Sequence, residues 1–266
     1  MKYSEIAALE LAAAGGWPAP ETAGLGGWLL RAGGGWTNRA NSALAVGDPG
    51  GTLEDAVERV REWYGERGLA PRFAVPLPLG RRTDGLLERL GWVAYMPTLV
   101  MVRDLSGPGG ELPGAGRLPG AGPLAGAAGP PPAAGPDIRL DAVPDPGWLA
   151  LMAGHKGALP EVAAPILTGP ELVTFASLVL DGELAAIGRG AVTDGWLGLS
   201  LIQVRPEHRR RGHAARLVAA LSDWGRGVSA TRAYLQVEEG NDPAVALYGR
   251  LGFEVHHNYI HRKMDA

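Results

Sequence analysis

The stretch LSLIQVRPEHRRRGHAARLVAA, residues 199–220, combines an apolar strand, a short basic turn and the start of a helix. Pro206 ends the strand, because proline has no amide proton to give to a neighbouring strand. From Gly212 onward the apolar side chains recur at helical spacing, which predicts a helix with one buried face. The residues on that face are Ala214, Leu217, Val218, Leu221 and Trp224.

The junction between the predicted strand and helix is strongly basic. Arg209, Arg210 and Arg211 lie where the free amides and the dipole of a helix already make a positive end. Three cations are unfavourable there unless an anion is bound. Gly212 leaves room for backbone to approach a ligand closely. Amides flanked by guanidinium groups suit a diphosphate; the alternative is a solvated basic helix start.

The composition limits the classes of function. The chain has 266 residues, 46% of them hydrophobic, a net charge of −3 and no cysteine. The acidic balance argues against a nucleic-acid binder and against a polybasic membrane surface. Without cysteine there is no disulfide, thiolate metal site or cysteine nucleophile. No apolar run is long enough to cross a bilayer, and acidic residues interrupt the N-terminal apolar segment, so we expect a cytoplasmic protein.

A segment rich in glycine, proline and alanine divides the chain. Residues 105–136 cannot form a periodic helix or strand and are predicted to be a linker. This leaves an N-terminal domain, residues 1–104, and a C-terminal domain, residues 137–266. LLERLGW at 86–92 resembles LYGRLGF at 247–253, at an offset of 161 residues. We interpret the two halves as a tandem duplication.

The N-terminal half has lost the basic turn. At the same offset the three arginines are replaced by Asp48, Pro49 and Gly50, and Tyr248 is replaced by Leu87. An aspartate repels a diphosphate, and leucine has no proton to give. We therefore expect a degenerate half that contributes packing and one wall of a substrate site.

The run GGWLLRAGGGWTNRANS, residues 26–42, is the most distinctive part of that half. It is interpreted either as a glycine-rich hairpin with tryptophan packing, which we favour, or as a ligand-facing loop. The candidate ligand-facing residues are Trp28, Trp36, Arg39, Asn41 and Ser42.

The C-terminal half predicts antiparallel hairpins followed by a β-α-β unit. Asp181-Gly182 and Asp194-Gly195 are strong hairpin signals because both dipeptides tolerate positive φ. Asp242 and Pro243 predict a helix start. The fold class is therefore α/β, a mixed sheet with helices on both faces. The expected strands are 137–140, 172–180, 184–192, 196–204, 233–237 and the last strands within 253–264, with helices at 144–154, 159–167, from 212 and from 242 to 251.

Two motifs at the expected separation resemble the GNAT N-acetyltransferase superfamily over the 130 residues from Asp137. They are V-x-P-x-x-R-x-x-G-x-A, residues 204–214, and N-x-x-A-x-x-L-Y-x-x-L-G-F, residues 241–253. The resemblance implies two tandem GNAT-like domains with acetyl-CoA as acyl donor and no metal. It implies that the donor is held by Ile202, Gln203, Val204, Arg209, Arg210, Arg211, Gly212, His213, Ala214, Ala215 and Asn241.

The resemblance also places Tyr248 at the general-acid position, where a phenol gives a proton to the departing thiolate; the alternative is a core tyrosine. No general base for the attacking amine is identified. The expected acceptor is a small-molecule or peptide amine, with no nucleic-acid or membrane partner, and the oligomeric state is left open. The alternative functions are a non-catalytic CoA-binding or regulatory module and, less favoured, a nucleic-acid binder.

Overall fold

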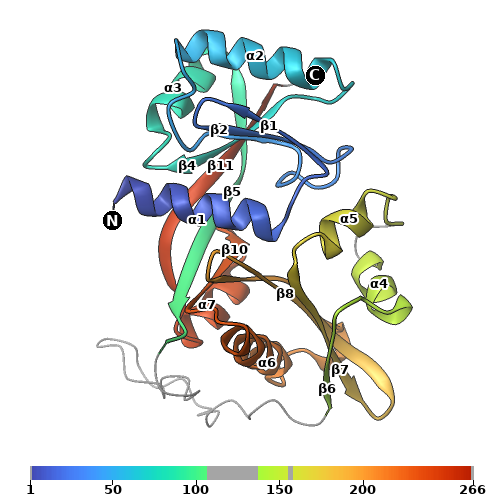
Figure 1. The fold of residues 1–266 in the computed structure, drawn as a ribbon. Helices are drawn as coiled ribbons and strands as arrows, with labels where there is room; N and C mark the ends of the chain where they lie inside the picture. Colours follow the sequence, from blue (N-terminus) through green and yellow to red (C-terminus); the bar gives the residue numbers. More distant parts are fainter. Residues whose placement is uncertain (1, 107–136, 155–157, 265–266) are drawn as a thin grey trace.

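One mixed sheet of eleven strands forms the frame of the protein (Figure 1). The computed structural model describes residues 2–106, 137–154 and 158–264. The strand order is β1-β2-β3-β4-β11-β5-β10-β9-β8-β7-β6. Parallel and antiparallel pairs occur together, so the predicted α/β class is confirmed. Residues 107–136 of the predicted linker lie outside the described residues.

The N-terminal half contributes five strands and three helices to the described residues. Thr52 caps its second helix by accepting a hydrogen bond from the Asp55 amide at 3.1 Å. The elements are α1 (Tyr3–Gly16), β1 (Glu21–Leu25), β2 (Trp28–Ala32), β3 (Ala43–Leu44), α2 (Leu53–Gly65), β4 (Arg72–Leu77), α3 (Arg81–Arg89) and β5 (Trp92–Asp104).

The C-terminal half follows the expected order. The two predicted hairpins are confirmed, since Asp181, Gly182, Asp194 and Gly195 all have positive φ. The elements are β6 (Ile138–Asp141), α4 (Pro146–Ala153), α5 (Ala163–Thr168), β7 (Leu172–Leu180), β8 (Glu183–Thr193), β9 (Trp196–Val204), the 3₁₀ turn η1 (Pro206–His208), α6 (His213–Gly227), β10 (Arg232–Glu238), α7 (Asp242–Arg250) and β11 (Glu254–Met264).

The last strands of the two halves cross over at the centre of the sheet. β5 lies between β10 and β11, and β11 lies between β4 and β5. Glu254 pairs with Val102, and Lys263 pairs with Val93. At the 161-residue offset Glu254 corresponds to Val93, and Val102 corresponds to Lys263. The pairing of β5 with β11 therefore has approximate two-fold symmetry. The sequence predicts more than one strand within residues 253–264, but the structure has one strand there, β11, among the described residues. The place beside β10 is taken by β5 of the N-terminal half. The domain boundaries stay a prediction.

Helices α1 and α6 cover opposite faces of the C-terminal part of the sheet (Figure 1). A side chain at Gly188 or Gly190 would meet Leu221 of α6 at 3.2 Å. Arg189, between them in β8, points the other way and donates to the Gly16 carbonyl at the end of α1. The face beside α6 carries the largest apolar core, and the face beside α1 carries buried polar groups.

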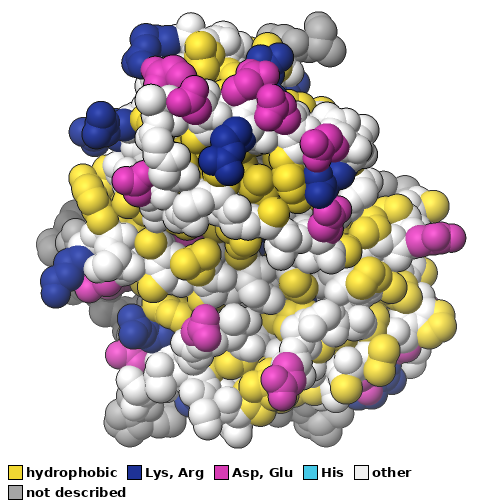
Figure 2. All heavy atoms as spheres, turned by 45° about the horizontal axis from the view of Figure 1, so that its top comes forward, with side chains coloured by type: hydrophobic (Ala, Val, Ile, Leu, Met, Phe, Trp, Pro, Cys, Tyr) yellow, Lys and Arg dark blue, Asp and Glu magenta, His cyan; other side chains and the backbone are white. Residues whose placement is uncertain are grey.

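The outer helix α2 carries charges of both signs. Figure 2 shows basic and acidic side chains side by side over this end of the molecule, and Arg61 pairs with Glu58 at 3.0 Å. In the part of the chain that the structure describes, no helix has the length and apolar character needed to cross a membrane.

Candidate active site

Strands β9 and β10 separate part-way along their length. Their parallel pairing runs from Trp196–Arg232 to Leu199–Leu235 and stops there. β9 continues to pair with β8 as far as Val204. The β9 edge at residues 202–204, which includes all three predicted strand contacts, therefore lacks a strand partner on the β10 side within the described residues. An open strand edge of this kind can bind an extended amide-bearing chain.

A bulge shapes the end of β9. The register against β8 shifts between Ile187 and Arg189, and Leu201 opposite has a φ of 56°. Bulges re-aim the strand and increase its local twist. The bulge thus lies at the point where β9 leaves β10.

The backbone of the turn after β9 leaves a row of amides open. Arg210 and Gly212 both adopt the left-handed conformation, with φ of 62° and 80°. Among the described residues, no protein acceptor receives a hydrogen bond from the amides of residues 210–215. These are the amides of Arg210, Arg211, Gly212, His213, Ala214 and Ala215, all of which the sequence predicts as ligands. Successive amides in a turn that opens a helix form an anion site.

Gly212 is required by its backbone angle. A Cβ built on it would meet nothing within 4 Å, so the space above the helix end is open. Its φ of 80° is one that glycine adopts freely and L side chains rarely adopt. As the N-cap of α6, Gly212 has no side chain to occupy the helix amides.

The basic side chains around this turn differ in their partners. Arg209 donates through Nε to the Val204 carbonyl at 3.2 Å. Arg210 and Arg211 are exposed, and neither forms an ion pair with another described residue. The His213 imidazole is buried without a hydrogen-bond partner for either nitrogen, and this burial lowers its pKa. Only its backbone amide is therefore presented toward the open side of the helix end.

Helix α7 carries the two remaining predicted residues. The Tyr248 ring packs 6.0 Å from that of Phe253, and burial raises the pKa of the phenol to about 12. Tyr248 is partly buried and packs against the apolar core of the C-terminal half, against which Ile202 and Val204 of the open β9 edge also pack. The phenol is neutral at pH 7 and is able to donate a proton.

Asn241 caps α7, which corrects the expectation that Asp242 would do so. Its side-chain oxygen accepts a hydrogen bond from the Ala244 amide at 3.3 Å. Asp242 is the first residue of the helix, and Pro243 follows it in the first turn. Proline is suited to that turn, because its missing amide proton costs nothing there. The Asn241 amide nitrogen is the part of the side chain left for a ligand.

The corresponding turn of the N-terminal half is closed by its own side chains. The Asp48 carboxylate accepts from the Gly50 amide at 2.8 Å, and Thr52 occupies the Asp55 amide. Leu87 is fully buried. At the 161-residue offset the Gly50 amide corresponds to the Arg211 amide, which stays open in the C-terminal half. The expected loss of anion binding in the N-terminal half stays a prediction.

The 26–42 run has two roles that the sequence does not separate. Trp28 and Ser42 are buried in the N-terminal half, and Asn41 ties the loop together by accepting from the Gly33 and Gly35 amides. For these three residues the favoured packing interpretation agrees with the structure. Trp36 and Arg39 instead face the other half.

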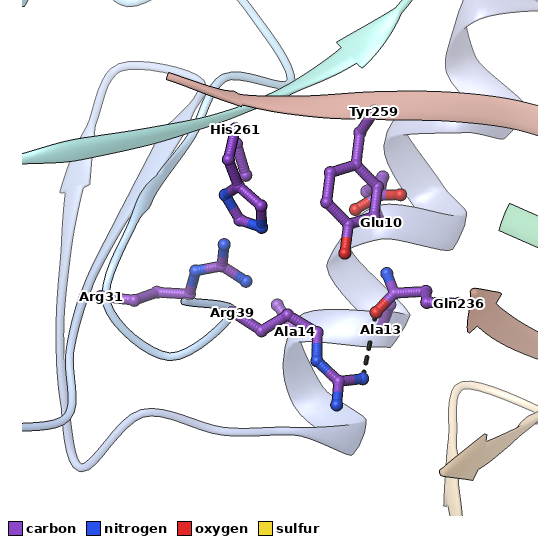
Figure 3. A pocket seen from close by; sticks show the side chains of 9 residues that line it. Glu10, Ala13, Ala14, Arg31, Arg39, Gln236, Tyr259 and His261 are labelled. Atoms are coloured by element: carbon purple, nitrogen blue, oxygen red, sulfur yellow. Dashed lines mark hydrogen bonds between the residues drawn. The ribbon is translucent and has the colours of Figure 1, made fainter. Parts of the chain in front are cut away.

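Arg39 reaches the C-terminal half across the sheet. Its Nη1 donates to Gln236 Oε1 of β10 at 3.1 Å (Figure 3). The Trp36 ring packs 5.9 Å from that of Trp17, and Trp17 lies under the Arg39 guanidinium. Sequence reasoning missed Trp17, Gln236 and Arg189. A charged residue between two glycines in a buried strand, Gly188-Arg189-Gly190, was the available signal for Arg189.

A small polar pocket lies next to this contact, between α1, β10 and β11. Glu10, Arg31, Tyr259 and His261 line it together with Arg39 (Figure 3). Within the described ranges, no group of three or more histidine, aspartate or glutamate side chains is arranged to hold a metal ion.

The comparisons with known proteins agree with this arrangement. A family model described as "Probable histone acetyltransferase Rv0428c C-terminal" matches residues 3–262. The chain is 34% identical over 275 residues to the probable histone acetyltransferase Rv0428c of Mycobacterium tuberculosis, covering 97% of this chain and 74% of the relative. It is 28% identical to the uncharacterized N-acetyltransferase YobR of Bacillus subtilis, covering 97% of this chain and 99% of that one.

Solved structures show the same fold. A GCN5-related N-acetyltransferase from Kribbella flavida aligns with a TM-score of 0.68 at 18% identity, over 98% of this chain and 96% of that one. A tandem GNAT protein from the clavulanic acid biosynthesis pathway aligns with a TM-score of 0.53 at 16% identity, over 79% and 68% of the two chains. The predicted tandem GNAT architecture is therefore confirmed. The chain belongs to the Rv0428c C-terminal family of GNAT N-acetyltransferases.

Proposed function

We propose that the C-terminal half transfers an acetyl group from acetyl-CoA to a primary amine by direct attack of the amine in a ternary complex. The observation that carries the proposal is the row of six open amides around Gly212, next to the unpaired edge of β9. Such amides bind a diphosphate, and Arg210 and Arg211 add positive charge without a protein partner.

The open strand edge supports the same proposal. Backbone groups at Ile202, Gln203 and Val204 offer hydrogen bonds to the amides of an extended pantetheine arm. Fixed donors beside the bound thioester stabilise the negative charge that grows on its carbonyl oxygen. The split after the Leu199–Leu235 pair is the place where that carbonyl would lie.

Tyr248 is proposed as the general acid. Its burial against the core that β9 also covers keeps the phenol protonated, since the pKa is raised to about 12. A protonated phenol provides the hydrogen that a departing thiolate needs. The step forms an N–C bond and breaks the C–S bond; the sulfur gains a proton, and the amine loses one.

Two measurements test this function. The first is the melting temperature with and without acetyl-CoA, because a ligand that binds only the folded state stabilises it. The second is thiol release from acetyl-CoA with a panel of amines that includes a histone peptide, chosen from the name of the Mycobacterium tuberculosis relative. We expect a raised melting temperature and amine-dependent thiol release. Binding without release with any amine would favour a non-catalytic CoA-binding module.

A further inference from the structure

Arg39 carries a charge that no described carboxylate neutralises. It lies in the loop between β2 and β3 and donates to the neutral amide of Gln236 at 3.1 Å. Its guanidinium carbon lies 4.4 Å from the centre of the Trp17 ring. Within the described residues, no aspartate or glutamate lies within ion-pair distance of Arg39. A guanidinium has five donors, and most of those on Arg39 are still free for a ligand.

Arg189 places a second guanidinium beside the same indole. It is 1% exposed, and its carbon lies 5.1 Å from the Trp17 ring centre. Nε donates to the Leu167 carbonyl at 2.8 Å and Nη1 to the Gly16 carbonyl at 3.0 Å. Nη2 is buried and has no hydrogen-bond partner among the described residues. Burial lowers the pKa of Arg189 to about 10, so the group is still a cation at neutral pH.

The one carboxylate that lines the adjoining pocket, among the described residues, is already engaged. Glu10 lines the adjoining pocket with Arg31 and Arg39 (Figure 3). Its Oε1 lies 2.8 Å from Nε2 of the buried His257. Arg31 is held by the Ser42 carbonyl and hydroxyl, which are neutral. The interior beside Gln236 therefore has an excess of positive charge, which is costly unless an anion is bound there.

This positive region lies at the split between β9 and β10. Gln236 is the first β10 residue after the final Leu199–Leu235 pair, and Ser200 is the first on β9. The Ser200 hydroxyl lies 3.5 Å from Nη1 of Arg189. The region is on the sheet face beside α1, opposite α6, whose N-terminal amides are open. An acceptor bound here would approach the thioester from the face that the donor does not cover.

We propose that the acceptor is a small amine that also carries a carboxylate, and that Arg39 binds this carboxylate. The inference rests on the proposed acetyl transfer and names the class of its substrate. A guanidinium binds a carboxylate through two parallel hydrogen bonds, with defined geometry. The fixed charge of Arg189 strengthens this binding at the split. The partly exposed Trp36 ring, which packs on the buried Trp17, supplies an apolar wall for the rest of the substrate.

The same charges discriminate against other amines. A polyamine or a lysine-rich peptide would bring further cations toward two uncompensated guanidinium groups, and like charges repel strongly where water is excluded. A substrate with one carboxylate neutralises the excess. The N-terminal half would then set the substrate class, because Arg39 comes from that half and Arg189 from the other.

The test uses pairs of amines that differ only by the carboxylate, each assayed by thiol release with saturating acetyl-CoA. Suitable pairs are phenylalanine with phenethylamine, tyrosine with tyramine, histidine with histamine, and tryptophan with tryptamine. We expect kcat/KM to be at least tenfold higher for the acid in the best pair. In Arg39→Gln the ratio of kcat/KM for the acid to kcat/KM for the matching amine should fall to about one, mainly through a higher KM for the acid. Arg39→Lys keeps the charge and should retain part of the preference for the acid.

The controls separate this inference from the proposed function. Arg232→Gln removes an exposed arginine at the far end of β10 and should leave the preference unchanged. Melting temperatures with acetyl-CoA report donor binding in every variant. This inference alone is overturned if acetyl-CoA raises the melting temperature and the enzyme turns over without any preference for the acid, or with faster turnover of polyamines. If acetyl-CoA does not raise the melting temperature of the wild-type protein, the proposed function is overturned as well.

Discussion

Thr52 and Gly212 cap the equivalent helices of the two halves, but only Thr52 uses a side chain to do so. Thr52 Oγ1 occupies the Asp55 amide, whereas Gly212 leaves the first amides of α6 open. In the N-terminal half the helix end is satisfied within the protein, and in the C-terminal half it is available to an anion. This contrast is the structural basis for assigning the donor site to one half.

Replacing Gly212 with valine should abolish the acetyl-CoA-dependent rise in melting temperature. A β-branched residue at a φ of 80° is strained by about 1–2 kcal/mol, and its side chain would enter the open space above the helix end. Gly227→Ala at the other end of α6 is the matched control, because a Cβ there also meets nothing within 4 Å and the φ is not positive. A full acetyl-CoA shift in Gly212→Val would refute the assignment of the donor site to this turn.

Replacing Thr52 with alanine should destabilise the protein without affecting the donor. Loss of an N-cap side chain costs about 1 kcal/mol, and the N-terminal half is not expected to hold acetyl-CoA. Urea titration should show a lower midpoint, while the ligand-induced shift stays the same as in the wild type. A selective loss of the shift would mean that the N-terminal helix end takes part in donor binding.

Replacing Tyr248 with phenylalanine should lower kcat by about a hundredfold or more, within the range usual for general acids. The acetyl-CoA shift should be unchanged, because the ring and its packing against Phe253 are kept. Tyr3→Phe, at a tyrosine that is 58% exposed, is the control for loss of a phenol elsewhere. Full activity in Tyr248→Phe would leave this tyrosine as a core residue only.

The pH profile offers a second check on Tyr248. A general acid must be protonated, and the raised pKa of about 12 keeps this phenol protonated throughout the range in which tyrosines usually begin to ionise. The rate should therefore show no fall assignable to this residue between pH 8 and pH 10. A falling limb in that range that disappears in Tyr248→Phe would contradict the burial seen here.

Local patterns predicted the C-terminal half well, since its signals act over short distances. The Asp181-Gly182 and Asp194-Gly195 turns have the positive φ angles that their dipeptides favour, and strands 172–180 and 196–204 have the expected bounds. Pattern within one segment could not predict which strands pair at the sheet centre. β5 and β11 are each compatible with either half, and only the assembled sheet decides between them.

Tertiary contacts also explain the missed residues of the site. Arg189 is buried because carbonyls of α1 and α5, distant in sequence, accept from it. Arg39 meets Gln236 across 197 positions of the chain. The glycines on either side of Arg189 mark that residue, but no local sequence signature identifies the partners of either arginine. The open amides after β9, in contrast, follow from a glycine beside a helix start.

The buried His261 should make the protein acid-sensitive in a way that one substitution removes. His261 is 1% exposed, its Nδ1 lies 3.3 Å from the Phe73 carbonyl, and burial, followed by the charge of Arg31, lowers its pKa to about 3. The unfolded chain takes up this proton near pH 6.5, so the stabilising contribution is present above pH 6.5 and is lost as the pH falls toward 3. Between pH 6.5 and pH 4.5 the wild type should lose about 2 kcal/mol of unfolding free energy through this group. His261→Phe should lack this part of the pH dependence of the unfolding free energy, as measured by urea titrations across the same pH range.

Tyr95→Phe is the control, because it alters the ring stacked on the imidazole but keeps the imidazole. This variant should retain the pH dependence of the wild type. Equal slopes in the wild type and in His261→Phe would show that the imidazole is not held neutral in the folded protein.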